Sequence, residues 1–288
     1  MADLLHPVPH PRPTAAHATA GPQPDAGTPW RPALIALDAD DTLWHNEPLF
    51  RMTQARFDAL LAPWADAPTV AAELAAVERR NLSTYGYGAK GFTLSMIETA
   101  LVLSGRQVGA DVLAEILEAG RELMRHPMEP LPGVADALER LAALAPLLLI
   151  TKGDLFHQES KLAASGLGRW FSGVEVVSEK DADTYRRAFG RHGVPAARAL
   201  MAGNSVRSDV LPPLALGAWG VLIPYPLVWS HEAAEVPHGH PRFRECASLD
   251  ALADWLQRLP PEPAAAASPS LSPSLALSPA PSSSRPEV

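Results

Sequence analysis

Five short apolar runs, each ending in small or polar residues, constrain the fold more than any other feature of this sequence. They are ALIALDAD (33–40), PLLLITK (146–152), VEVVSE (174–179), ALMAGNS (199–205) and GVLIPYP (220–226). Runs of this length are typical of buried strands. Amphipathic stretches separate the last four runs, and alternation of strand and helix leads to parallel pairing through right-handed crossovers. The sequence therefore predicts an α/β domain with a doubly wound parallel sheet.

The interval between the first two runs is much longer than the others. It contains four stretches with apolar residues at helical spacing, at 49–64, 69–81, 92–105 and 111–126. A structureless loop of this length would be unusual in a compact domain. We therefore expect an inserted, all-helical second domain at residues 47–127. The α/β core would then be formed by residues 30–46 and 128–259.

Proline gathers at the two ends of the chain. Of the 30 prolines, seven lie between Pro7 and Pro29 and eight between Pro260 and Pro286. These segments mix Pro, Ala and Ser without apolar periodicity, a composition that cannot bury enough surface to offset chain entropy. We predict that residues 1–29 and 260–288 are disordered tails.

Charge and hydropathy exclude several classes of partner. The formal net charge of −8 argues against binding along the phosphate backbone of nucleic acid. No apolar run approaches the roughly 18 residues of a membrane span, and the N-terminus lacks a secretory pattern. The single cysteine, Cys246, cannot form an internal disulfide and is expected in the core. We therefore expect a cytoplasmic protein without nucleic-acid or membrane partners, and the pattern leaves its oligomeric state open.

Chemically useful side chains follow the first four runs. They are Asp38, Asp40, Asp41 and Thr42, then Thr151, Lys152, Gly153 and Asp154, then Lys180, and finally Asn204 and Asp209. The carboxyl ends of parallel strands meet at one edge of a sheet, where ligands bind. Clustered carboxylates repel one another unless a cation relieves them, and Mg²⁺ prefers such oxygen ligands. A lysine and a threonine hydroxyl at the same edge suit an anionic, oxygen-rich ligand, with phosphate the leading candidate.

The ordered motifs resemble the haloacid dehalogenase superfamily. They are LDADDTLW (37–44), Thr151 after a run of aliphatic residues, Lys180, and GNSVRSD (203–209), and the resemblance spans roughly residues 33–226. It implies a Rossmann-like core, and the long helical interval is similar to the cap domain of many members.

The resemblance also implies roles for individual residues. Asp38 would be the nucleophile that forms an aspartyl-phosphate, and Asp40 the general acid and base. Thr151 would bind a phosphoryl oxygen, and Lys180 would neutralise charge. Mg²⁺ would bind the Asp38 carboxylate, the Asp40 backbone carbonyl and Asp209.

Further residues complete the predicted site. Asn204 stands where many members have Asp, so its part in binding the metal is open, although an amide oxygen can coordinate. We place Thr42, Lys152 and Gly153 at the phosphate pocket. From the glycine-containing segment 81–92, Tyr85, Tyr87 and Lys90 are candidates for substrate contact.

The predicted function is a Mg²⁺-dependent phosphatase acting on a small phosphorylated metabolite. Family members that remove halide from carbon need no leaving-group acid, so an aspartate at position 40 favours phosphoryl transfer. A phosphomutase of the same family is an alternative, as is a non-enzymatic phosphoacceptor or binding protein. Receiver domains place their acceptor aspartate after a middle strand and have no helical insert, unlike this chain.

Three other features receive simpler interpretations. Lys161 lies in an amphipathic stretch, where a solvent-exposed position is the default. Asp41 is expected to face away from the phosphate. His231, His238 and His240 lack cysteine partners and helical spacing, and we interpret them as part of a surface loop rather than as zinc ligands.

Overall fold

Six parallel strands form one sheet in the computed structural model, which describes residues 30–260. In sheet order they are β3 (Phe171–Val177), β2 (Leu147–Lys152), β1 (Leu34–Leu37), β4 (Ala199–Gly203), β5 (Trp219–Leu222) and β6 (Phe243–Glu245). The order confirms the predicted doubly wound sheet, with β1 at its centre. β6 was not predicted, because three residues are too few to show an apolar pattern. The predicted tails lie outside the described residues, apart from Pro260.

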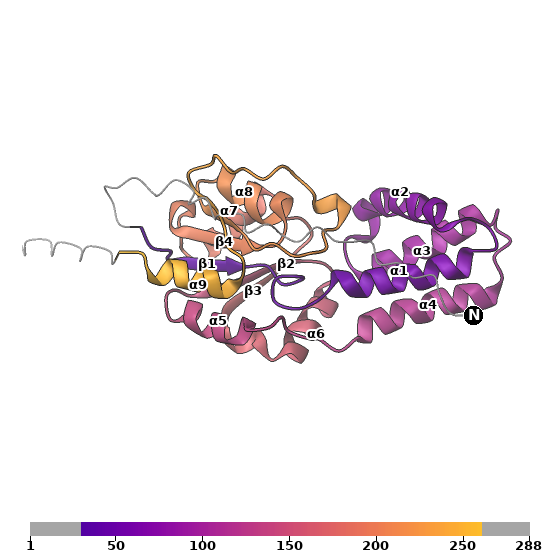
Figure 1. Ribbon diagram of the computed structural model, residues 1–288, viewed down its shortest axis with the longest axis horizontal. Helices are drawn as coiled ribbons and strands as arrows, with labels where there is room; N and C mark the ends of the chain where they lie inside the picture. The colour runs from indigo at the N-terminus through magenta and orange to yellow at the C-terminus, as the bar shows by residue number, and fades with distance from the viewer. Residues whose placement is uncertain (1–29, 261–288) are drawn as a thin grey trace, which may run out of the picture.

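Alternate residues of the buried strands pack against helices on opposite faces of the sheet. Ile35 and Leu37 share an apolar cluster with α5 (Val134–Ala142) and α9 (Leu249–Gln257). Leu34 and Ala36 share another with α7 (Ala182–Arg191). Figure 1 shows these helices on the two sides of the strands.

The remaining short elements connect the layers. They are α6 (Leu155–Ser165), η1 (Leu167–Trp170), η2 (Ala196–Arg198), the π-helical turn η3 (Val206–Val210), α8 (Leu211–Ala215) and η4 (Ser230–Glu232). Within residues 30–260 no helix is long and apolar enough to cross a membrane.

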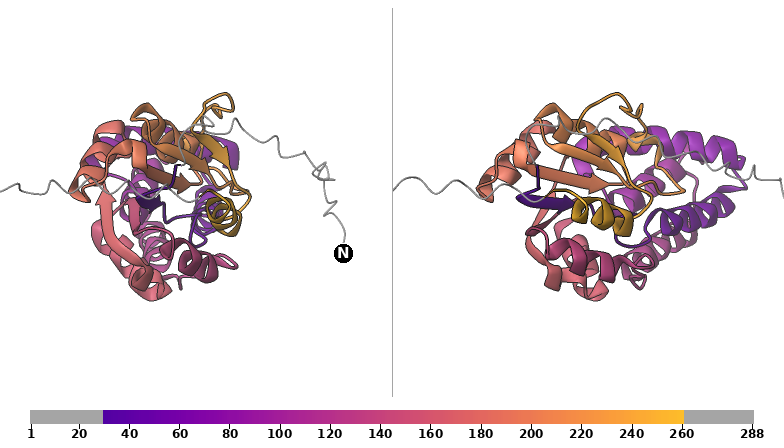
Figure 2. Two further views of the ribbon diagram at one scale, coloured as in Figure 1. Left: turned by 90° about the vertical axis from the view of Figure 1, so that its left-hand side faces the viewer. Right: turned by 60° about the vertical axis from the view of Figure 1, so that its left-hand side comes forward.

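The first four of the five helices between β1 and β2 form a group that we call the helical insertion. They are α1 (Glu47–Leu61), α2 (Ala67–Tyr85), α3 (Ala89–Leu103) and α4 (Ala110–Arg125). They enclose a separate apolar cluster that includes Phe57, Met96 and Ile116. Figures 1 and 2 show the insertion beyond one end of the sheet, the end towards which β1 points. The polar strand ends therefore face the insertion.

Candidate active site

Asp38 follows β1 at the centre of the sheet. Its backbone N–H donates to the Ala202 carbonyl of β4 (2.9 Å), and its side chain is buried. At the end of β4, a Cβ on Gly203 would lie 2.3 Å from Asp209 Oδ2 and 2.8 Å from the Cβ of Asp38. Only glycine therefore leaves room for the two carboxylates beside each other. This is the edge at which open parallel sheets bind ligands.

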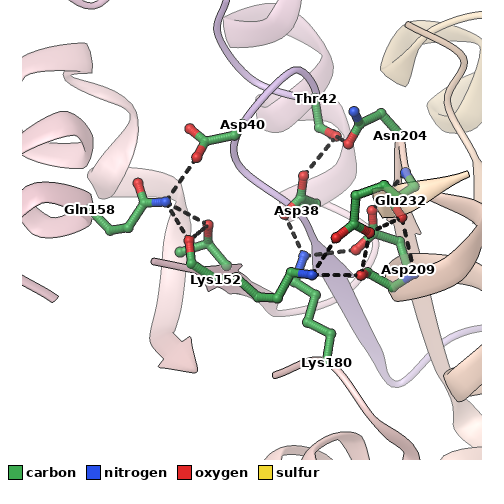
Figure 3. A network of polar contacts seen from close by, with 12 residues as sticks. Asp38, Asp40, Thr42, Lys152, Gln158, Lys180, Asn204, Asp209 and Glu232 are labelled. Atoms are coloured by element: carbon green, nitrogen blue, oxygen red, sulfur yellow. Dashed lines mark hydrogen bonds and ion pairs between the residues drawn. The ribbon is translucent and has the colours of Figure 1, made fainter. Parts of the chain in front are cut away.

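Lys180 lies between these two carboxylates (Figure 3). Its Nζ contacts Asp38 Oδ1 and lies 2.7 Å from Asp209 Oδ1, and all three side chains are buried. The Ser205 N–H donates to the other Asp209 oxygen (2.9 Å). Burial by itself lowers the pKa of Lys180, but the two carboxylates raise it above its usual range. Burial, opposed by the Lys180 charge, raises the pKa of Asp38 to about 7. One ammonium group facing two carboxylates gives the site an unbalanced negative charge when both are ionised.

The amide of Asn204 faces two acceptor oxygens. With its nitrogen turned towards them, it donates to Asp38 Oδ2 (3.2 Å) and to the Asp40 backbone carbonyl (3.3 Å). With the amide oxygen there instead, Thr42 Oγ1 donates to it (3.5 Å), and Thr42 also donates to Asp38 Oδ2 (3.3 Å). In that second orientation three oxygen atoms converge, which is the donor chemistry that a hard divalent cation prefers.

A cation at this place would depend on amide and backbone oxygens as well as carboxylates. Across residues 30–260, no three His, Cys, Asp or Glu side chains group as metal ligands. Asp209 has one oxygen on Lys180 and the other on Ser205. Although the Asn204 amide carries no negative charge, it lies beside the Asp38 carboxylate and the Asp40 carbonyl, where its oxygen could serve as a metal ligand.

The Asp40 side chain turns towards α6 (Figure 3). Its Oδ1 accepts from Trp44 Nε1 (2.7 Å) and Lys161 Nζ (2.5 Å), and its Oδ2 accepts from Gln158 Nε2 (2.9 Å). Burial by itself raises the pKa of Asp40, but the charge and hydrogen bond of Lys161, with the bonds from Gln158 and Trp44, hold it below the usual 3.8. Lys161 is buried, so the prediction of a solvent-exposed lysine was wrong. The amphipathic pattern of α6 does not reveal that this face meets the segment after β1.

Asp41 turns to the start of α1. It has a left-handed backbone conformation (φ 60°), and its carboxylate accepts from the N–H groups of Asn46 (2.9 Å) and Glu47 (3.0 Å). Accepting these otherwise unpaired N–H groups stabilises the helix end. The side chain thus fixes where the helical insertion begins.

Lys152, the last residue of β2, and Gly153, which follows it, line the cavity with Thr151. Lys152 Nζ lies 2.5 Å from Glu232 Oε1, 2.9 Å from Ser208 Oγ and 4.2 Å from the centre of the Tyr87 ring. The lysine predicted to bind phosphate is therefore paired with a carboxylate. Sequence reasoning missed Glu232, because it lies in η4, a three-residue turn too short to show an apolar pattern.

Segment 81–92 lines the cavity from the insertion side, and of its two candidate tyrosines Tyr87, but not Tyr85, lies in the cavity wall. The Tyr87 hydroxyl donates to Glu179 (2.7 Å), and its ring packs edge-on against Trp229. Tyr85 is 47% exposed and does not line the cavity. Lys90 does not line it either and forms an ion pair with Asp154 (2.9 Å). The substrate contacts predicted for Tyr85 and Lys90 are corrected accordingly: Tyr85 ends α2 outside the cavity wall, and Lys90, near the start of α3, is held by Asp154.

The cavity has a volume of about 350 Å³, which suits a small metabolite. Its core half is lined by the predicted Asp38, Asp40, Thr151, Lys180, Asn204 and Asp209. Thr42 lies behind Asp38 and does not line the cavity. Its insertion half combines apolar side chains such as Phe50, Leu74 and Phe92 with polar ones such as Gln54, Glu78 and Asn81.

Gln158 and Lys161 are site residues that sequence reasoning missed. They lie three positions apart, on one face of the helix that follows Asp154, and α6 begins directly after a predicted strand end. This spacing is the signal that the sequence offers, but it does not show that the face packs against the acidic cluster.

The fold and the site place the protein among α/β proteins that have a doubly wound parallel sheet and an acidic pocket beneath a helical insertion. The family model for haloacid dehalogenase-like hydrolases matches residues 32–217. The chain belongs to this family.

Solved structures agree with this assignment. A haloacid dehalogenase-like family hydrolase from Xanthomonas campestris is 43% identical, with 84% of this chain and 96% of that chain covered and a TM-score of 0.71. A 2-haloacid dehalogenase from Pseudomonas syringae (21% identity, 79% and 99% covered, TM-score 0.53) shares the fold. So does a predicted phosphoglycolate phosphatase from Haemophilus somnus (16%, 78% and 97%, TM-score 0.55). No curated protein matches the chain.

Proposed function

We propose that the protein is a Mg²⁺-dependent phosphatase that hydrolyses a small phosphate monoester. Its structural neighbours include both a dehalogenase and a predicted phosphatase, so the fold alone does not separate the two reactions. The observation that carries the proposal is Asp40, a second carboxylate in the cavity two residues after Asp38. Breaking a P–O bond leaves an alkoxide that needs a proton, whereas a departing halide needs none.

Asp38 is the proposed nucleophile. One of its carboxylate oxygens attacks phosphorus, the bond from phosphorus to the leaving oxygen breaks, and an aspartyl-phosphate forms. Lys180, already in contact with Asp38, balances the negative charge that gathers there. Thr151, buried at the end of β2 and lining the same cavity, supplies a hydroxyl for a phosphoryl oxygen.

Asp40 is the proposed acid and base. It gives a proton to the leaving oxygen in the first step. In the second, it takes a proton from the water that attacks phosphorus, and Asp38 leaves with the electrons of its P–O bond. Its position beside the cavity supports this role, and the hydrogen bonds that both oxygens accept favour the ionised form that acts as the base in the second step.

The donor set fits Mg²⁺. Asp38, the Asp40 backbone carbonyl and the Asn204 amide oxygen would hold the ion, with Asp209 close by. When bound, the ion would offset negative charge at the phosphoryl group and help to align it with Asp38. Two buried carboxylates facing one ammonium group are the reason that a cation is expected here.

The test compares the two reactions on the full chain. We expect the purified protein to release phosphate from p-nitrophenyl phosphate with Mg²⁺, and to lose that activity with EDTA and in Asp38→Asn. Chloride release from 2-chloropropionate should be absent. Chloride release without phosphate release would overturn the proposal, and phosphate release that survives in Asp38→Asn would overturn the assignment of the nucleophile.

A further inference from the structure

Lys161 is a buried lysine for which the proposed reaction has no role. Its side chain is only 5% exposed, and its Nζ lies 2.5 Å from Asp40 Oδ1 and 3.0 Å from Asn46 Oδ1. Lysines are almost never fully buried unless they are paired. Both partners come from the segment that follows β1, whereas Lys161 comes from α6. The lysine therefore joins two parts of the chain that are 115 to 121 positions apart.

Gln158, one turn earlier on α6, holds the other Asp40 oxygen. Its Nε2 lies 2.9 Å from Asp40 Oδ2, 3.2 Å from Thr151 Oγ1 and 2.6 Å from the Lys152 carbonyl. Trp44 Nε1 adds a third donor on the Asp40 carboxylate. Among these donors only Lys161 is charged, so it alone adds the attraction between opposite charges to its hydrogen bond with the carboxylate. Lys161 is thus the principal contact that fixes the carboxylate.

Asn46 gives this contact a second consequence. It directly precedes α1, the first helix of the insertion, and the Asp41 carboxylate accepts from its backbone N–H. One ammonium group therefore contacts both the proposed acid and the residue at which the chain enters the insertion. A shift of the insertion relative to the sheet would therefore change the contacts of Lys161 with Asn46 and Asp40.

We infer that Lys161 is a positioning residue: it holds the Asp40 carboxylate in place and joins it to Asn46 at the start of the helical insertion. The inference rests on the proposed function, in which Asp40 is the acid and base. Lys161 acts through Asp40 and does not contact the reacting group.

The first test measures the dependence of the rate on the leaving group. A well-placed acid matters more for phenyl phosphate than for p-nitrophenyl phosphate, whose leaving group is the better one. We expect Lys161→Met to lower kcat/KM for phenyl phosphate roughly tenfold more than for p-nitrophenyl phosphate, within the 10²–10⁴-fold that acid–base catalysis supplies. Lys161→Arg should restore most of the loss. Arg186→Met, which removes an exposed cation of α7, is the matched control and should change neither ester.

A double-mutant cycle tests whether the effect passes through Asp40. In Asp40→Asn, adding Lys161→Met should change the ratio of the two rates by less than about twofold. Equal losses on both esters, or full additivity of the two substitutions, would overturn the inference.

The second test reads the contact without turnover. Trp44 donates its indole N–H to Asp40, so its indole resonance in a ¹H–¹⁵N spectrum reports where that carboxylate lies. The chain has seven tryptophans, and Trp44→Phe assigns the signal. In Lys161→Met we expect the Trp44 resonance to move while those of Trp219 and Trp255 stay in place. In Lys161→Arg it should stay near its original position.

The two tests separate failure of the inference from failure of the proposed function. If the wild-type protein hydrolyses neither ester, the proposed function is wrong, and the Trp44 resonance alone decides whether Lys161 holds Asp40. An unmoved Trp44 resonance in Lys161→Met would overturn the inference, even in an active enzyme. Movement of all the indole resonances would indicate general unfolding and would overturn a specific positioning role.

Discussion

The ammonium group of Lys180 lies 2.7 Å from the Asp209 carboxylate, and both side chains are almost completely buried. The same ammonium group contacts Asp38, so a single positive charge serves two buried carboxylates. A charge that is buried away from water costs free energy unless an opposite charge is paired with it. The arrangement therefore joins the stability of the fold to the chemistry of the site.

Removing that positive charge should destabilise the protein. We expect Lys180→Met to lower the free energy of unfolding by roughly 3–5 kcal/mol, because two buried carboxylates then lose their partner. The matched control is Lys90→Met, which breaks an exposed pair with Asp154 and should cost at most about 1 kcal/mol. Urea unfolding followed by circular dichroism measures both. Equal effects would mean that the Lys180 pair adds nothing specific.

The close approach of β1 and β4 at Gly203 gives a second prediction. Gly203→Ala should abolish activity, because its Cβ would fall 2.3 Å from Asp209 Oδ2 and force the two carboxylates apart. Gly190→Ala is the control: it lies within α7, has no atom within 4 Å of the added Cβ, and should be neutral or stabilising. Hydrolysis of p-nitrophenyl phosphate and thermal unfolding are measured for both. An active Gly203→Ala variant would show that the ends of β1 and β4 can move apart without loss of activity.

The Asn204 amide predicts how the site responds to metal. Asn204→Asp would replace a donor 3.2 Å from Asp38 Oδ2 with a third negative charge. We expect a lower melting temperature without Mg²⁺ and a larger rise on adding it, because a ligand stabilises the state that it binds. Thermal unfolding over a MgCl₂ titration, with Asp183→Asn as an exposed control, measures this. A Mg²⁺ response smaller than that of the wild type would contradict the proposed ligand set.

The sheet and the core half of the site could be predicted because they depend on local pattern. Each of the first four apolar runs leads into residues that form the site, and parallel order brings those strand ends together. Asp38, Thr151, Lys180 and Asp209 therefore meet as expected.

The rest depends on how separate elements pack. Lys161 appears solvent-exposed in a helical pattern, and only the placement of α6 against the segment after β1 buries it. Similarly, the left-handed turns at Gly86 (φ 70°) and Gly88 (φ 105°) decide that Tyr87 rather than Tyr85 faces the core. Glu232 lies in the short turn η4, where no periodicity indicates which residues turn inwards.

Glu78 of α2 lines the insertion half of the cavity and gives a pH prediction. The Glu78 carboxylate has no hydrogen bond or ion pair within the described part of the chain. Burial, together with the nearby Glu47 carboxylate, raises its pKa from 4.5 to about 7. Between these two values the folded protein keeps a proton that the unfolded chain has released. Stability therefore falls as the pH rises through this range.

Glu78→Gln removes this dependence and serves as the test. We expect the variant to be more stable than the wild type at pH 8, by an amount on the order of 2 kcal/mol, and the difference to shrink towards pH 5. Urea unfolding at the two pH values measures it. Glu139→Gln removes an exposed carboxylate of α5 and should show no such pH-dependent gain. A Glu78→Gln variant that gains nothing at pH 8 would mean that Glu78 is ionised in the folded protein and has a partner there, which would make it a direct candidate for binding a cationic group of the substrate.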